Sequence, residues 1–160
     1  MTVVTSLPNH PYWTIHEIMA VQRAETIAEL ALVALRILNR MPQPIVQVCG
    51  PISTGGAGTM EQNVARFRQA IAVLQSRGLN VFDQMPFQES MIRISKKIRE
   101  SGYCWEILDE FYGPIFRSGL IKRTYFLSGW RSSIGANWER RVVRKQGIPR
   151  EQFLDKWFKS

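Results

Sequence analysis

Residues 45–59 read IVQVCGPISTGGAGT and give the clearest indication of the fold class. The first five are mostly apolar, rich in β-branched side chains and closed by Gly50-Pro51, a pattern typical of a buried parallel strand. A glycine-rich loop comes next, then an amphipathic helix that ends near Gly78, and then a short apolar run at residues 79–82. Strand, loop, helix and strand within about 40 residues predict a right-handed βαβ unit.

Patterns on either side extend this unit. Residues 14–40 predict one long helix, begun by the capping box of Thr14 and Glu17 and stopped by Pro42. Downstream, the patterns predict helical segments at 90–118 with a break at 101–102, a strand at 121–127, a helix at 133–146 and a short terminal helix at 150–159. We therefore predict an α/β fold, a three-layer Rossmann- or flavodoxin-like domain with a short parallel sheet and an added N-terminal helix.

The domain organisation follows from the same reading. We expect residues 1–43 to form a helical extension that packs on the domain or on a partner, and residues 44–160 to form the α/β domain. No apolar run approaches the roughly 20 residues of a membrane span, and the N-terminus lacks a basic region, so we expect a cytoplasmic protein without a membrane partner. Cys49 and Cys104 have no CxxC spacing, and two histidines alone make a poor metal site. Nothing in the sequence demands a metal or an organic cofactor.

Positive charge is concentrated near the C-terminus. The net charge is +8, and residues 121–160 carry ten Lys and Arg against three acids, which is +7 of that total. Such asymmetry favours an anionic partner. A phosphorylated small molecule, RNA, DNA, a basic subunit interface and a merely solvated face all fit the pattern.

Two loops at predicted strand ends carry the candidate chemistry. Glycines at residues 50–56 let the backbone approach a ligand, and the N-terminus of the following helix offers free N–H groups to an anion. In the second loop, Ser133 is a natural N-cap, and Gly135 lies one turn before Glu139 on the same helix face. That apolar face predicts that Glu139 points toward the sheet; the alternative is a surface Glu paired with Arg140 or Arg144.

These two motifs together support a family resemblance. The Val-Cys-Gly-Pro-Ile-Ser loop and the later Leu-Ser-Gly-Trp-x-x-Ser-x-Gly-Ala-x-x-Glu segment resemble the nucleoside 2-deoxyribosyltransferase-like superfamily, in particular its small bacterial and phage members of unassigned function. The resemblance covers roughly residues 45–149. The chain departs from the family pattern at Leu127-Ser128, where an acid or proline is usual, and at residues 150–152, where an apolar strand is usual.

The resemblance implies a set of site residues. Glu139 would be the nucleophile that attacks the anomeric carbon of a ribosyl or deoxyribosyl group, and Asp83 or Asp109 would be the second acid. The residues implied in substrate binding are Gly50, Pro51, Ile52, Ser53, Gly55, Gly56, Gly129, Trp130, Ser133 and Gly135. Among these, Ser53, Gly55, Gly56 and Ser133 would hold a phosphate or a sugar hydroxyl. A homodimer is plausible by analogy with the family and from the broad apolar face of the N-terminal helix.

Three functions remain open at this point. The first is cleavage or transfer of an N-glycosidic bond, as in a nucleoside deoxyribosyltransferase or a nucleotide N-glycosidase. The second is a non-catalytic nucleotide-binding or sensing module on the same fold. The third is nucleic-acid or protein interaction through the basic C-terminal surface, for which the sequence carries no helix-turn-helix, zinc-finger or RNA-binding signature.

Overall fold

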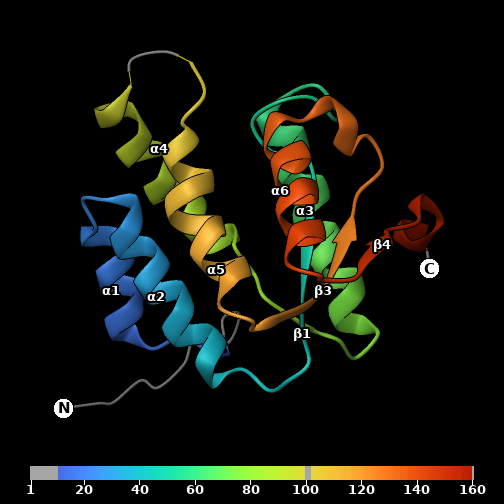
Figure 1. Ribbon diagram of the computed structural model, residues 1–160, viewed down its shortest axis with the longest axis horizontal. Helices are drawn as coiled ribbons and strands as arrows, with labels where there is room; N and C mark the ends of the chain where they lie inside the picture. Colours follow the sequence, from blue (N-terminus) through green and yellow to red (C-terminus); the bar gives the residue numbers. More distant parts are fainter. Residues whose placement is uncertain (1–10, 100–101, 160) are drawn as a thin grey trace. The chain divides into compact units, whose positions relative to one another are not determined.

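The computed structural model describes residues 11–99 and 102–159, which hold six α-helices and a four-stranded parallel sheet (Figure 1). The predicted α/β class is confirmed. The chain divides into two compact units. One comprises Met1–Met41 and Pro86–Ile115 and is helical; the other comprises Pro42–Met85 and Phe116–Ser160 and contains the sheet.

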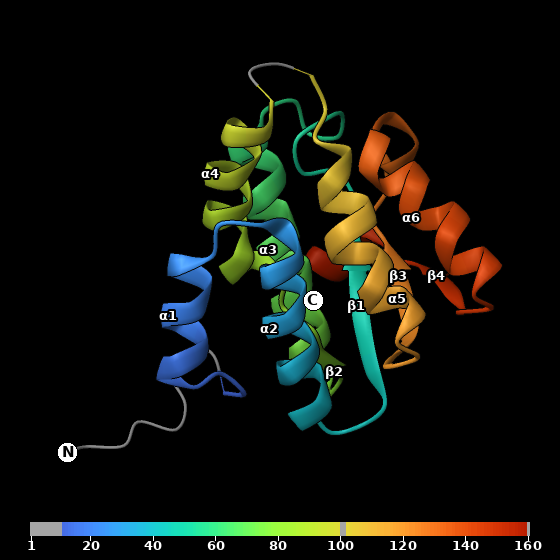
Figure 2. The ribbon, with the colours of Figure 1, turned by 60° about the vertical axis from the view of Figure 1, so that its left-hand side comes forward.

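The sheet orders its strands β2-β1-β3-β4. The strands are β1 (Ile45–Cys49), β2 (Asn80–Val81), β3 (Ile121–Phe126) and β4 (Arg150–Gln152), and the helices that join them within this unit are α3 (Met60–Ser76) and α6 (Ile134–Lys145). α3 connects β1 to β2, and α6 connects β3 to β4 in the opposite direction across the sheet. Right-handed crossovers in opposite directions place the two helices on opposite faces, which gives three layers (Figure 2).

The α3 face of the sheet carries a compact apolar core. Its buried members are Val46, Val48, Phe67, Ala70, Ile71, Leu74, Val81, Met85, Leu127 and Phe153. Full burial of each large side chain is worth about 1.5–3 kcal/mol, so this cluster fixes α3 on the sheet. The capping box of Thr59 and Gln62 begins α3, and Gly78, with φ +83°, lies just past its end as predicted.

The C-terminal segment differs from the prediction. A helix was expected over residues 150–159, whereas the structure has the strand β4 followed by a short 3-10 helix, η4 (Asp155–Lys159). β4 forms the edge of the sheet beside β3, and the N–H of Thr124 donates to the carbonyl of Pro149 at 2.9 Å. All three β4 residues are exposed, so this strand has none of the apolar signal that marks a buried one.

The helical unit is built around aromatic side chains. Its elements are α1 (Ile15–Arg23), α2 (Ile27–Arg40), α4 (Gln88–Ile98), the π-helix η2 (Ile107–Tyr112) and the start of α5 (Gly113–Arg117); a 3-10 turn, η1 (Met85–Phe87), precedes α4. The ring centroid of Phe87 lies 5.0 Å from that of Trp13 and 5.0 Å from that of Phe111. The predicted break at 101–102 falls between α4 and η2, and Ser101 itself lies outside the described residues.

The single N-terminal helix predicted over residues 14–40 is wrong. The structure has two helices. The first ends because the backbone of Ala24 is not helical, with φ −57° and ψ 138°, and the second begins after Thr26, whose side chain accepts the N–H of Glu29. The guanidinium of Arg93 donates to the carbonyl of Ala24 at 2.8 Å and thereby satisfies the end of α1. The capping box of Thr14 at the start of α1 is confirmed. Within residues 11–99 and 102–159, no helix is both long and apolar enough to cross a bilayer.

Candidate functional site

Two loops leave the carboxyl edge of the sheet side by side. β1 and β3 are parallel neighbours, so the loop of residues 50–59 and the loop of residues 127–133 start at the same edge. Ligands of open α/β sheets bind beyond this edge. The N–H of Leu127 donates to the carbonyl of Cys49 at 2.9 Å, and a Cβ on Gly50 would come within 2.9 Å of the Leu127 side chain. Glycine is therefore required where the first loop begins.

The two loops are also joined further out. The N–H of Gly56 donates to Oγ of Ser132 at 2.8 Å, and the N–H of Ile134 donates to Oγ1 of Thr54 at 3.0 Å. Gly55 has φ +68°, and a Cβ there would lie 2.3 Å from the carbonyl oxygen of Ser132. The loops are thus joined by two backbone-to-side-chain hydrogen bonds and by the close approach of Gly55 to the Ser132 backbone. The N–H of Gly56, a residue predicted to hold a phosphate, is therefore already bonded within the chain.

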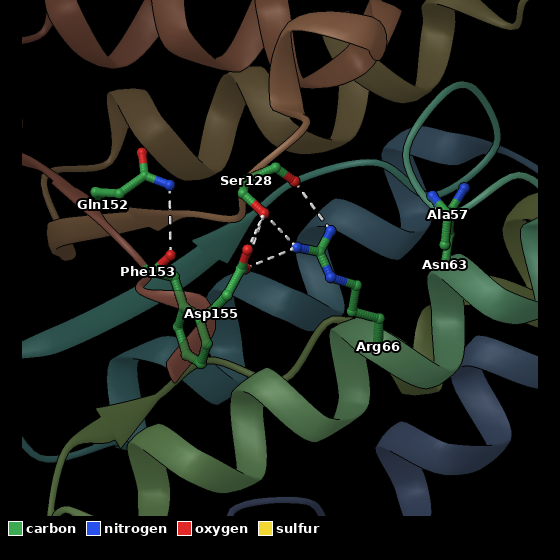
Figure 3. Close-up of polar contacts among 7 residues, drawn as sticks. All are labelled: Ala57, Asn63, Arg66, Ser128, Gln152, Phe153 and Asp155. Carbon is green, nitrogen blue, oxygen red and sulfur yellow. Dashed lines mark hydrogen bonds and ion pairs between the residues drawn. The ribbon is translucent and has the colours of Figure 1, made fainter. Parts of the chain in front are cut away.

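Asn63 organises the glycine-rich loop from the first turns of α3 (Figure 3). It is buried, its Oδ1 accepts the N–H of Ala57 at 2.8 Å, and its Nδ2 donates to the carbonyls of Ile52 at 3.1 Å and Gly55 at 2.9 Å. Sequence reasoning missed this residue. The available signal was a polar amide on the apolar face of a predicted helix, directly after a glycine-rich loop.

Glu139 lies buried on α6, against the end of β1. Only 6% of it is exposed, and its carboxyl group shares a hydrogen bond with the thiol of Cys49. Burial raises the pKa of Glu139 to about 8, although the hydrogen bond from Cys49 partly opposes this. The pKa of Cys49 is also raised well above its ordinary range, first by burial and then by the neighbouring carboxylate. At neutral pH the pair is therefore predominantly protonated, and Glu139 faces the sheet as its helix face predicted.

Two buried glutamines near this edge were not anticipated. Gln47 lies at the centre of β1 with 0% exposure, and neither atom of its amide has a hydrogen-bond partner among the described residues. Gln84 donates from Nε2 to the carbonyl of Val48 at 3.0 Å. Its Oε1 is buried and accepts no hydrogen bond from any residue that the structure describes. The signal for Gln47 was its position in an otherwise apolar strand.

The two candidates for the second acid lie in different units. Asp83 follows β2 in the sheet-containing unit, is half-buried, and accepts the N–H of Met85 at 2.9 Å. Asp109 lies on η2 in the helical unit and is exposed. Only Asp83 therefore belongs to the same compact unit as Glu139.

The other predicted site residues all lie in the sheet-containing unit. Ser133 is the N-cap of α6, and its Oγ accepts the N–H of Ala136 at 3.1 Å. Gly135 is half-buried one turn before Glu139, whereas Ser53 is exposed. The remaining predicted residues of the two loops are placed as follows: Pro51 is buried, Ile52 and Trp130 are half-buried, and Gly129 is exposed with φ +83°.

Ser128 ties the second loop to α3 and to the C-terminal segment (Figure 3). Its Oγ accepts from Nη2 of Arg66 at 2.6 Å and donates to the carboxylate of Asp155 at 2.8 Å. Arg66 also donates to the carbonyl of Ser128 at 2.9 Å and forms an ion pair with Asp155 at 3.2 Å. A proline at position 128 would lack the hydroxyl, so the serine has a structural role in this chain.

The described residues were also considered as metal ligands, and the chain was compared with known proteins. Across residues 11–99 and 102–159, no group of three or more His, Cys, Asp or Glu side chains is placed to hold a metal ion. Comparison with known protein families, with curated proteins and with solved structures finds no significant match.

Proposed function

We propose that this chain cleaves or transfers the N-glycosidic bond of a nucleoside or nucleotide, with Glu139 as the nucleophile. The observation that carries the proposal is a carboxyl group buried against β1 at the ligand-binding edge of an α/β sheet, with a strongly raised pKa. Structural burial alone also raises a pKa, so the position of Glu139 beside Cys49, directly before the glycine-rich loop, matters equally. The motif shared with the nucleoside 2-deoxyribosyltransferase-like superfamily supports the same assignment.

The chemistry requires Glu139 in its ionised form. Its carboxylate oxygen attacks C1′ of the sugar, the C1′–N bond breaks, and the electron pair passes to the nitrogen of the base. Asp83 is the proposed acid–base group, which relays a proton from water to the departing base. The hydroxide that remains attacks C1′, which releases the sugar and restores the Glu139 carboxylate. A second base in place of water would give transfer.

The raised pKa of Glu139 makes this mechanism dependent on pH. With a pKa of about 8, roughly one tenth of the carboxyl groups are ionised at pH 7. Base release in the free protein should therefore rise through pH 7 and pH 8 and level off only above about pH 9. Because only 6% of Glu139 is exposed, a substrate must also displace neighbouring chain to reach it.

The test is base release from a panel of ribo- and deoxyribonucleosides and their monophosphates, followed by chromatography between pH 6 and pH 9. The Glu139→Gln variant keeps the size of the side chain and removes the carboxylate, so release should fall by several orders of magnitude. The Glu61→Gln variant, at an exposed position on α3, is the matched control and should behave like the unmodified protein. Release that survives Glu139→Gln would refute the role of Glu139.

A second candidate is a nucleotide-binding module without turnover. It is favoured by the hydrogen bonds that Gly56 and Ile134 already make between the loops, and by a Glu139 that is predominantly neutral at pH 7. This candidate predicts that calorimetry detects a nucleotide while no member of the panel releases its base, and that Glu139→Gln leaves the affinity within a few-fold.

A further inference from the structure

Two arginines lie over Trp130 on the α6 side of the sheet, and a third, Arg150, lies close enough to Arg140 to act on its charge. The Cζ atom of Arg131 lies 4.5 Å from the Trp130 ring centroid, and that of Arg140 lies 4.8 Å from the same centroid. Arg140 also lies 4.9 Å from the ring of Phe126 on β3. We name Arg131, Arg140 and Arg150 the arginine cluster.

The register of the sheet places Arg150 on the same face as Phe126. Arg150 pairs with Thr124, two residues before Phe126, and paired residues of parallel strands point to the same face. Arg150 therefore lies on the face of the sheet that carries Phe126, where α6 packs next to β4 (Figure 2). Consistently, the pKa of Arg140 is lowered, first by burial and then by the charges of Arg150 and Arg131.

No acid neutralises the arginine cluster within the part of the chain that the structure describes. None of its guanidinium groups forms an ion pair there, whereas Arg40 pairs with Glu17, Arg66 with Asp155, Arg99 with Glu106 and Arg123 with Glu151. The three acids of residues 121–160 are all otherwise engaged. Glu139 is buried beside Cys49, Glu151 pairs with Arg123, and Asp155 pairs with Arg66.

Contact with the aromatic rings prepares Arg131 and Arg140 for an anion. A guanidinium has five N–H donors in its plane, and contact of its face with an aromatic ring leaves those edges available. Holding the side chain in place also lowers the entropy lost when a ligand binds. An anion at this point would relieve the mutual repulsion of three like charges.

The positive surface continues along α6 beyond the arginine cluster. Arg141, Arg144 and Lys145 are exposed and form none of the ion pairs of the described chain. Arg144 lies four residues after Arg140, about 6 Å further along the helix. A duplex carries one negative charge per roughly 1.7 Å of its axis, so a surface of this length faces several phosphates rather than one.

From this arrangement, we infer that the arginine cluster and the adjoining surface of α6 bind the phosphate backbone of a nucleic acid. The contact is made to phosphates and so is independent of base sequence. Nucleic-acid binding by this surface is independent of the cleavage proposed for Glu139, and either can fail without the other.

The experiment measures fluorescence anisotropy of a labelled DNA duplex of about 20 base pairs between 50 and 200 mM salt. One variant, Arg131→Gln with Arg150→Gln, removes two charges from the arginine cluster. The matched variant, Arg68→Gln with Lys156→Gln, removes two exposed charges elsewhere in the same unit and leaves the same net charge. Circular dichroism verifies that both variants fold.

The cluster variant should bind the duplex about 25- to 100-fold more weakly than the unmodified protein at 100 mM salt. The slope of its log affinity against log salt concentration should correspond to roughly two fewer phosphate contacts. The matched variant should lose less than fivefold. Equal losses in the two variants would show that net charge alone drives binding and would overturn the inference. Binding to vesicles rich in phosphatidylserine, or to free phosphate, without measurable binding to the duplex would also overturn the inference.

Discussion

Replacing Glu139 with Gln should change how the stability of the fold depends on pH. The pKa of Glu139 is about 8 in the folded chain and 4.5 as an ordinary glutamate. Since the folded pKa is raised, the folded state binds the proton more tightly than the unfolded state. The resulting stabilisation is fully present below pH 4.5 and is lost as the pH rises through 8.

The size of the effect follows from the same two pKa values. Each unit of difference in pKa corresponds to about 1.36 kcal/mol, so this group alone should lower the free energy of unfolding by about 3–4 kcal/mol between pH 5 and pH 8. The Gln side chain does not titrate, so Glu139→Gln should lose this contribution. Glu17 and Glu106, whose pKa values are lowered, act in the opposite direction in both proteins and cancel in the difference.

The assay is urea unfolding followed by tryptophan fluorescence at half-unit steps from pH 5 to pH 8.5. The difference in unfolding free energy between Glu139→Gln and the unmodified protein should shift in favour of the variant by about 3–4 kcal/mol over this range. Glu61→Gln, at an exposed site, should run parallel to the unmodified protein. Parallel curves for Glu139→Gln as well would mean that Glu139 titrates normally in the folded chain and would contradict its raised pKa.

Three further substitutions test how the two loops are held. Asn63→Ala removes three hydrogen bonds to the glycine-rich loop, so thermal unfolding should show a loss of about 2–4 kcal/mol, and a loss below 0.5 kcal/mol would contradict the role given to this amide. Gly55→Ala should cost about 1–3 kcal/mol more than Gly78→Ala, because both have positive φ but only the former would place its Cβ against Ser132; equal losses would refute the contact. Ser128→Ala should cost about 1–2 kcal/mol and accelerate proteolysis of the C-terminal segment, and unchanged cleavage would show that the contact with Asp155 does not hold that segment.

The parts of the fold that were predictable are those whose local sequence pattern matches the burial or the backbone conformation that they have in the structure. β1 is buried along its whole length, so its apolar run identified it directly. The end of α3 was predictable because Gly78 serves a local backbone requirement. The burial of Glu139 was predictable from the face it shares with Gly135.

The parts that were missed depend on residues distant in sequence. β4 is polar and exposed, and its strand conformation depends on pairing with β3. The break between α1 and α2 depends on Arg93, which donates to Ala24 from 69 residues away. The pKa of Glu139 is raised because α6 packs this carboxyl against β1, which supplies Cys49 from 90 residues earlier, so the shift could not be read from local pattern.

The most direct test of the account is to trap the sugar on Glu139. A 2-deoxy-2-fluoro nucleoside slows the second step of such a reaction, because the fluorine at C2′ destabilises positive charge at C1′ when water attacks. After incubation at pH 8, mass spectrometry of the digested protein should find the fluorinated sugar on the peptide that contains Glu139, and Glu139→Gln should carry none. Release of base without an adduct, or an adduct on any other residue, would contradict the claim that Glu139 is the nucleophile.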